Sequence, residues 1–214
     1  MLIRTIRAWS FFIVTLMIPV TAFSIYNWYE EDLADLPYYD KGILFTGDVT
    51  QLSKVPAFSF MNQDSLPLNE DFVKGKVWVA HYFFVSCPTI CPIMVNSMKL
   101  VQEAYNQSNE VRMISLTVDP KHDKVDVLKK YAGTKHINTD QWQLGTADKK
   151  ILYQFARKGL YIIATDGDGG TDDFIHSDRL VLIDQNRHVR GYYDGLDESD
   201  VDHLIKDIKR LRND

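Results

Sequence analysis

Cys87 and Cys91 are the only two cysteines among 214 residues, and their thiols are the side chains of this chain best suited to redox or metal chemistry. They lie in Ser86-Cys87-Pro88-Thr89-Ile90-Cys91-Pro92, where an apolar strand predicted over residues 77–84 meets a helix. Residues four apart share one helix face with Cα atoms about 6 Å apart, which allows a disulfide or a shared metal ion. The helix N-terminus also stabilises thiolates. The pair therefore predicts a redox couple or a metal clamp.

The donor set favours copper over zinc. Two thiolates are too few for a closed structural zinc site, whereas soft sulfur ligands at low coordination number suit Cu(I). One imidazole would complete a Cys2His site and help it to hold Cu(II). His176 is a candidate because it follows the Gly- and Asp-rich residues 165–173, where chain reversal would bring it over the junction; on spacing alone, an ordinary surface role stays open. His81, inside the first strand, is interpreted as a packed or supporting residue.

The elements that must position these residues alternate between strands and helices. Apolar runs predict strands over residues 55–60, 77–84, 111–118, 142–144, 161–164, 179–184 and 188–193. Periodic apolar positions predict helices after Cys91 and over residues 123–132, 147–156 and 201–211, with Thr146 as the N-cap of the helix over 147–156. This order predicts the α/β class, with a thioredoxin-like mixed sheet flanked by helices.

The N-terminal segment predicts a transmembrane helix. No charged residue occurs from Ala8 to Trp28, and about 20 apolar residues suffice to span a bilayer. Arg4 and Arg7 precede this run and an acidic cluster over residues 30–32 follows it, so the positive-inside rule keeps the N-terminus in the cytoplasm. We expect a single-pass anchor over residues 1–29 in a bacterial inner membrane, a tether over 30–54, and a domain over 55–214 facing the periplasm. A signal peptide cleaved near residue 22 is the alternative.

The composition excludes other classes of function. The net charge of −5, the pI near 5.7 and the lack of a basic cluster argue against nucleic-acid binding. The apolar share of 45% and the charged share of 25% are those of a globular protein. We expect no enzyme with a small-molecule substrate, although a thiol–disulfide reductase activity stays open.

Several segments resemble the Sco/SenC family, copper-binding thioredoxin-like proteins of cytochrome c oxidase assembly. They occur in the family's order and are Phe84–Pro92, Leu116–Pro120 with Asp123 after it, Phe174–Ser177, Leu180–Asp184 and Gly191–Gly195. An N-terminal anchor with an exported domain is also the family arrangement. The resemblance implies copper, as Cu(I) or Cu(II), bound by Cys87, Cys91 and His176.

Two functions follow from this resemblance. The first is a metallochaperone that delivers copper to the dinuclear copper centre of cytochrome c oxidase, with the copper-bearing oxidase subunit and a copper donor protein as partners. The second is a thiol–disulfide oxidoreductase in which Cys87 and Cys91 form the redox pair and keep the acceptor cysteines reduced. Three residues between the cysteines, instead of the two of most thioredoxin-type oxidoreductases, favour copper.

Overall fold

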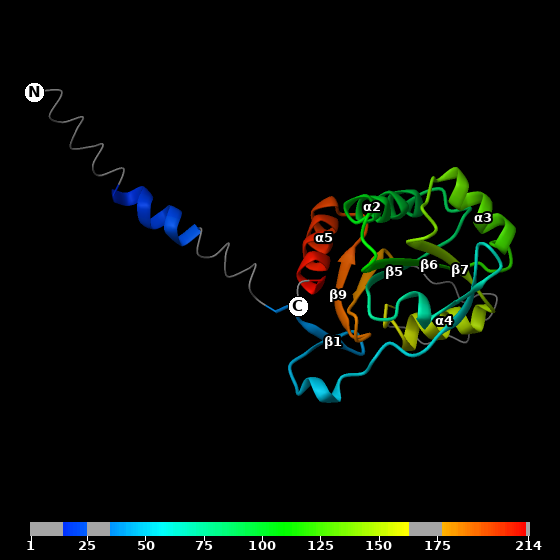
Figure 1. The fold of residues 1–214 in the computed structure, drawn as a ribbon, viewed down its shortest axis with the longest axis horizontal. Coiled ribbons are helices and arrows are strands. Elements are labelled where there is room, and N and C mark those ends of the chain that lie inside the picture. The colour runs from blue at the N-terminus through cyan, green and yellow to red at the C-terminus, as the bar shows by residue number, and fades with distance from the viewer. Residues whose placement is uncertain (1–14, 25–34, 163–176, 213–214) are drawn as a thin grey trace, which may run out of the picture. The chain divides into compact units, whose positions relative to one another are not determined.

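The computed structural model describes residues 15–24, 35–162 and 177–212 (Figure 1). The chain divides into two compact units, Met1–Asp35 and Leu36–Asp214. In the first unit, residues 15–24 are helical. None of the helices within the described residues is both long enough and apolar enough to cross a bilayer. The rest of the anchor predicted over residues 1–29 lies outside the described residues.

The second unit is built on a mixed sheet. Its strands follow the order β2-β1-β9-β8-β5-β6-β7-β3-β4. The parallel part is β5-β6-β7, and the remaining neighbours are antiparallel. The bounds are β1 Tyr38–Asp40, β2 Ile43–Phe45, β3 Ser59–Asn62, β4 Pro67–Asn69, β5 Val77–Phe83, β6 Val111–Thr117, β7 Trp142–Thr146, β8 Arg179–Ile183 and β9 Val189–Asp194.

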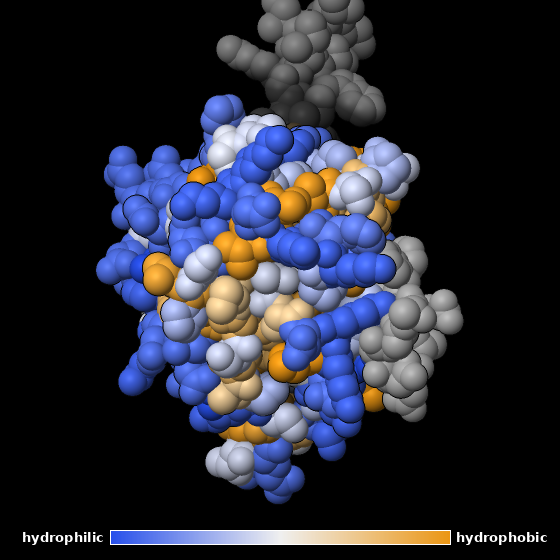
Figure 2. Space-filling model, turned by 90° about the vertical axis from the view of Figure 1, so that its right-hand side faces the viewer, coloured by the Kyte–Doolittle hydropathy of each residue, from blue (hydrophilic) through white to orange (hydrophobic). Residues whose placement is uncertain are grey.

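Helices cover both faces of this sheet (Figure 1). One face packs against α2 (Ile90–Ala104), α3 (Val125–Thr134) and α5 (Glu198–Arg212), and the other packs against α4 (Lys149–Lys158). Each face has its own apolar cluster, and most of the surface seen in Figure 2 is hydrophilic. Two short 3-10 helices, Val49–Gln51 and Glu70–Phe72, complete the described elements.

The strand that precedes the cysteines lies at the centre of the sheet. All seven residues of β5 are buried, because helices cover both of its faces and β6 and β8 pair with its two edges. Such strands carry apolar residues on both sides, as Trp78 and Val79 do. The strand predicted over residues 77–84 is therefore confirmed, and it leads into the junction that carries the cysteines.

The segment predicted as a tether differs from that expectation. Residues 38–45 within it form β1 and β2, and Tyr39 pairs with Val189 of β9. Arg190 explains the attachment, because its guanidinium donates to the Leu36 carbonyl at 2.6 Å and the Pro37 carbonyl at 3.1 Å. Asp184 accepts a hydrogen bond from the same guanidinium at 3.2 Å.

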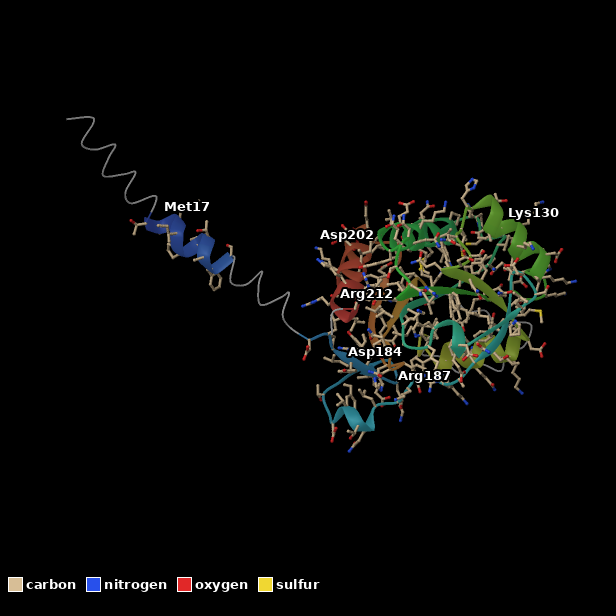
Figure 3. All side chains as sticks on the ribbon, viewed as in Figure 1. Met17, Lys130, Asp184, Arg187, Asp202 and Arg212 are labelled. Atoms are coloured by element: carbon tan, nitrogen blue, oxygen red, sulfur yellow. The ribbon has the colours of Figure 1, made fainter. Side chains whose placement is uncertain are left out.

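Smaller differences concern single elements. The strand expected over residues 55–60 forms at Ser59–Asn62 and lies inside the sheet, since β4 pairs with its other edge. The cap of α4 is Asp148 instead of Thr146. Residues 161 and 162 are not in a strand, and the remainder of the strand expected over 161–164 lies outside the described residues. The hairpin of β8 and β9 turns near Asp184 and Arg187, which lie at the same end of the sheet (Figure 3).

Candidate metal centre

The cysteines follow the C-terminal end of β5, where the neighbouring parallel strand β6 also ends. The Val118 N–H donates to the Phe83 carbonyl at 2.9 Å, which keeps the two chain ends side by side. A turn then closes with the Cys87 N–H on the Phe84 carbonyl at 3.3 Å, and α2 begins three residues later. Pro92 occupies the first turn of this helix, where its missing N–H breaks no intrahelical bond.

The two thiols are buried together and are not joined by a disulfide. Cys87 is 9% exposed and Cys91 is 3% exposed. The backbone N–H of Cys91 donates to Cys87 Sγ at 3.4 Å, so the sulfur of Cys87 lies at the open N-terminus of α2. The two cysteines lie at the start of α2, but Cys87 precedes the helix, so the shared helix face expected from their spacing does not form.

The environment gives the two thiols opposite pKa shifts. Burial acts to raise the pKa of Cys87, but hydrogen bonds from Cys91 and Thr89 together outweigh burial and lower this pKa to about 7. Burial raises the pKa of Cys91 to about 12, and the charges of Cys87 and Asp123 add to that effect. Cys87 is therefore the thiol that ionises as the pH passes through about 7, while the Cys91 thiol keeps its proton.

Two further residues surround the pair. Burial raises the pKa of Tyr131 to about 12, and the charges of both cysteines and of Asp123 contribute to this shift. The ring of Tyr131, from α3, packs on Phe83 with ring centroids 5.6 Å apart. Asp123 is 2% exposed and accepts hydrogen bonds from Val85 and Thr117. In the sequence, Asp123 followed the segment Leu116–Pro120 that resembles the family, but no role was assigned to it. No sequence pattern indicated Tyr131.

His81 is a packed residue, one of the two roles considered for it. Its side chain is fully buried, and Nε2 lies 2.6 Å from Ser115 Oγ. Ser115 Oγ also accepts a hydrogen bond from Trp142 Nε1 at 2.7 Å, so the serine hydroxyl proton is free to be donated to His81. Burial lowers the pKa of His81 to about 4, which makes the imidazole neutral at physiological pH.

His176, the predicted third ligand, lies outside the described residues. Across residues 15–24, 35–162 and 177–212, no three His, Cys, Asp or Glu side chains are arranged to hold a metal ion. His122 contacts Asp119 at 2.7 Å through Nδ1, and His188 and His203 lie 3.7 Å and 3.9 Å from acidic partners. The described part of the site therefore supplies two soft sulfur donors, which fit a copper ion bound at low coordination number.

Comparisons with known proteins agree on one family. The SCO1/SenC family model matches residues 48–213. The SCO1 protein homolog of Bacillus subtilis is 34% identical over 158 residues, which are 73% of this chain and 81% of that protein.

Two solved structures share the mixed sheet with flanking helices. A SCO1/SenC family lipoprotein from Bacillus anthracis is 32% identical, with a TM-score of 0.65 over 74% of this chain and 95% of that chain. BsSco, described as a member of the Sco family of cytochrome c oxidase assembly proteins with a disulfide switch, is 33% identical, with a TM-score of 0.64 over 75% and 94%.

Proposed function

Since the chain belongs to the SCO1/SenC family, we propose that it is a copper metallochaperone that delivers copper to the dinuclear copper centre during cytochrome c oxidase assembly. The observation that carries this proposal is the buried pair of Cys87 and Cys91 at the N-terminus of α2, where hydrogen bonds lower the pKa of Cys87 to about 7. Copper is the cargo of this function, and the chain's own residues hold it and release it.

The choice of copper rests on the donors and on relatives. Cys87 and Cys91 are the soft ligands, and His176 is the proposed third ligand that adapts the site to Cu(II). ScoI from Bradyrhizobium japonicum, 17% identical, was solved with copper bound, and a relative from Stutzerimonas stutzeri, 23% identical, is named a putative copper-binding protein. These two relatives support copper as the cargo in this proposal.

The ionisation of the pair suits capture and transfer. The Cys87 thiolate takes the incoming ion first, and the Cys91 thiol then releases its proton to solvent as its sulfur joins the ion. Transfer reverses these steps, because an acceptor thiolate displaces one protein sulfur at a time. Reprotonation of Cys91, whose free pKa is about 12, favours release of the copper at the end of the exchange.

The second candidate is a thiol–disulfide oxidoreductase, favoured by the same thiolate. The Cys87 thiolate would attack an acceptor disulfide and form a mixed disulfide, with one acceptor sulfur leaving as a thiolate. Cys91 would then attack Cys87 Sγ and give its proton to the second acceptor sulfur as that sulfur leaves, which yields a Cys87–Cys91 disulfide and an acceptor thiol. The disulfide switch described for BsSco supports this alternative.

The proposed setting is a bacterial inner membrane. Residues 1–29 would anchor the chain in a single pass, and the copper domain would face the periplasm, where the copper-bearing oxidase subunit and a copper donor protein are the proposed partners. The second compact unit begins at Leu36, so in this arrangement the tether would cover residues 30–35.

Copper binding to the reduced full chain in detergent, compared with its His176→Ala variant, tests the proposal. We expect one copper ion per chain and a sulfur-to-Cu(II) charge-transfer band that the variant loses. If the chain retains no copper but still reduces a model disulfide, the oxidoreductase becomes the better proposal.

A further inference from the structure

Asp123 is a buried carboxylate near the cysteine pair. It has no role in the proposed steps of copper capture. It is 2% exposed, and its Oδ2 accepts two hydrogen bonds, from the Val85 N–H at 3.1 Å and from Thr117 Oγ1 at 2.6 Å. Thr117 Oγ1 itself accepts from the Asp119 N–H at 2.9 Å, so the threonine proton is directed at Asp123. Burial raises the pKa of Asp123, whereas the two donors on Oδ2 favour its ionised form and act in the opposite direction.

These hydrogen bonds join the chain segments that carry the site. Val85 lies two residues before Cys87, in the turn that follows β5, whereas Thr117 is the last residue of β6. Asp123 therefore fixes the turn from which Cys87 projects to the end of the neighbouring strand. Without this carboxylate, the Val85 N–H would lose its described acceptor.

The charge of Asp123 is not paired with a base in the described structure. Among the residues described, no lysine or arginine lies within ion-pair distance of its carboxylate. Its hydrogen bond to the Val85 N–H places it against the turn that carries Cys87. Its charge also helps to raise the pKa of Cys91 and of Tyr131. A buried, unpaired negative charge is costly in itself and becomes favourable when a cation binds beside it.

We propose that Asp123 is a positioning residue for the copper ligands and that its charge favours Cu(II) over Cu(I) at the site. The hydrogen bond to Val85 supplies the positioning. The charge supplies the selectivity, because a fixed negative charge attracts a doubly charged ion twice as strongly as a singly charged one. The selectivity rests on the proposed copper function, whereas the positioning does not.

Asp123→Asn separates the two parts of the inference, because asparagine keeps an oxygen acceptor and removes the charge. The full chain in detergent would be assayed for affinity to Cu(I) and Cu(II) and, without copper, for exchange of the Val85 amide proton. We expect the ratio of Cu(II) to Cu(I) affinity to fall about tenfold or more, with the Val85 amide still protected. Asp126→Asn is the matched control, because this exposed residue of α3 loses the same charge in solvent.

Asp123→Ala removes the acceptor as well, so we expect the Val85 amide to exchange at least tenfold faster than in Asp123→Asn. If wild type and Asp123→Asn have the same affinity ratio, the selectivity is refuted while the copper function stands. If the wild-type chain binds no copper, the copper function and the selectivity fail together. The positioning is then judged by Val85 exchange alone, and equal protection in the alanine and asparagine variants refutes it. If the alanine variant does not fold, Thr117→Val replaces it, because this substitution removes the other hydrogen-bond donor to Asp123. We then expect the Val85 amide to exchange at least threefold faster than in wild type. Unchanged exchange would refute the positioning.

Discussion

His81 makes the stability of this fold depend on pH. Burial in the central strand lowers the pKa of His81 to about 4, compared with the ordinary value of 6.5 that the unfolded chain restores. Between these two values the unfolded state binds the proton and the folded state does not. The stabilisation is therefore complete above about pH 6.5 and is lost progressively as the pH falls toward 4.

The magnitude follows from the gap between the two pKa values. At about 1.4 kcal/mol per pKa unit, a gap of about 2.5 corresponds to about 3 kcal/mol of unfolding free energy. That is a large part of the total unfolding free energy of a typical protein, which is about 5–15 kcal/mol. For a domain of this size, it would lower the melting temperature by about 6–12 °C.

Urea unfolding of the full chain in detergent at several pH values between 4 and 7, with His81→Gln beside it, measures this contribution. Glutamine does not titrate and offers a nitrogen or an oxygen to Ser115 in place of Nε2. We expect wild type to lose about 3 kcal/mol more than the variant as the pH falls from 7 to 4. His203→Gln is the control, because that imidazole is 61% exposed on α5. Parallel pH profiles for wild type and His81→Gln would show that His81 does not cause the pH dependence of stability.

Three further predictions concern the thiols and the scaffold. Iodoacetamide should alkylate Cys87 at a rate that rises through about pH 7, while Cys91 stays unreactive below about pH 10. Peptide mapping by mass spectrometry measures both rates, and equal pH profiles for the two thiols would contradict the prediction. Gly159→Ala should destabilise the domain by about 1–3 kcal/mol, since the new Cβ would lie 2.7 Å from the Phe155 carbonyl oxygen. Gly133→Ala, with open space around its Cβ, should instead stabilise α3 by about 0.5–1 kcal/mol in the same denaturation assay, and the reverse order of the two variants would count against the packing described. Arg190→Ala should cost about 3 kcal/mol and expose the Tyr39 amide to exchange, because it removes the guanidinium that pairs with the buried Asp184 and donates to the Leu36 and Pro37 carbonyls. Unchanged unfolding and exchange would show that Arg190 does not hold β1.

Elements with long, consistent apolar patterns could be predicted from the sequence. The strands over residues 77–84 and 111–118 are confirmed as β5 and β6, and the face built on Val201, Leu204 and Ile208 is confirmed in α5. The position of Cys87 and Cys91 between strand and helix followed from the same patterns, because the change from an apolar run to a helical period marks the junction.

Features that depend on distant partners could not be predicted. The strands β1 and β2 have three residues each, and the tertiary partner Arg190 lies about 150 positions later, so no local period identifies them. The role of Asp123 depends on the Val85 N–H, 38 residues earlier. The sequence around His81 did not show that both faces of β5 are buried, since this depends on how α2 and α4 pack on opposite faces of the sheet.

Copper transfer to a pre-reduced soluble fragment of the oxidase subunit that carries the dinuclear copper centre is the decisive test of the proposed metallochaperone function. The full chain would be loaded with one copper ion and mixed with this fragment beside a copper chelator. We expect the fragment to gain copper from the wild-type chain and none from a chain carrying Cys87→Ser and Cys91→Ser. If the reduced fragment gains no copper, while the disulfide form of the fragment is reduced by the copper-free chain, the metallochaperone proposal is wrong and the oxidoreductase takes its place.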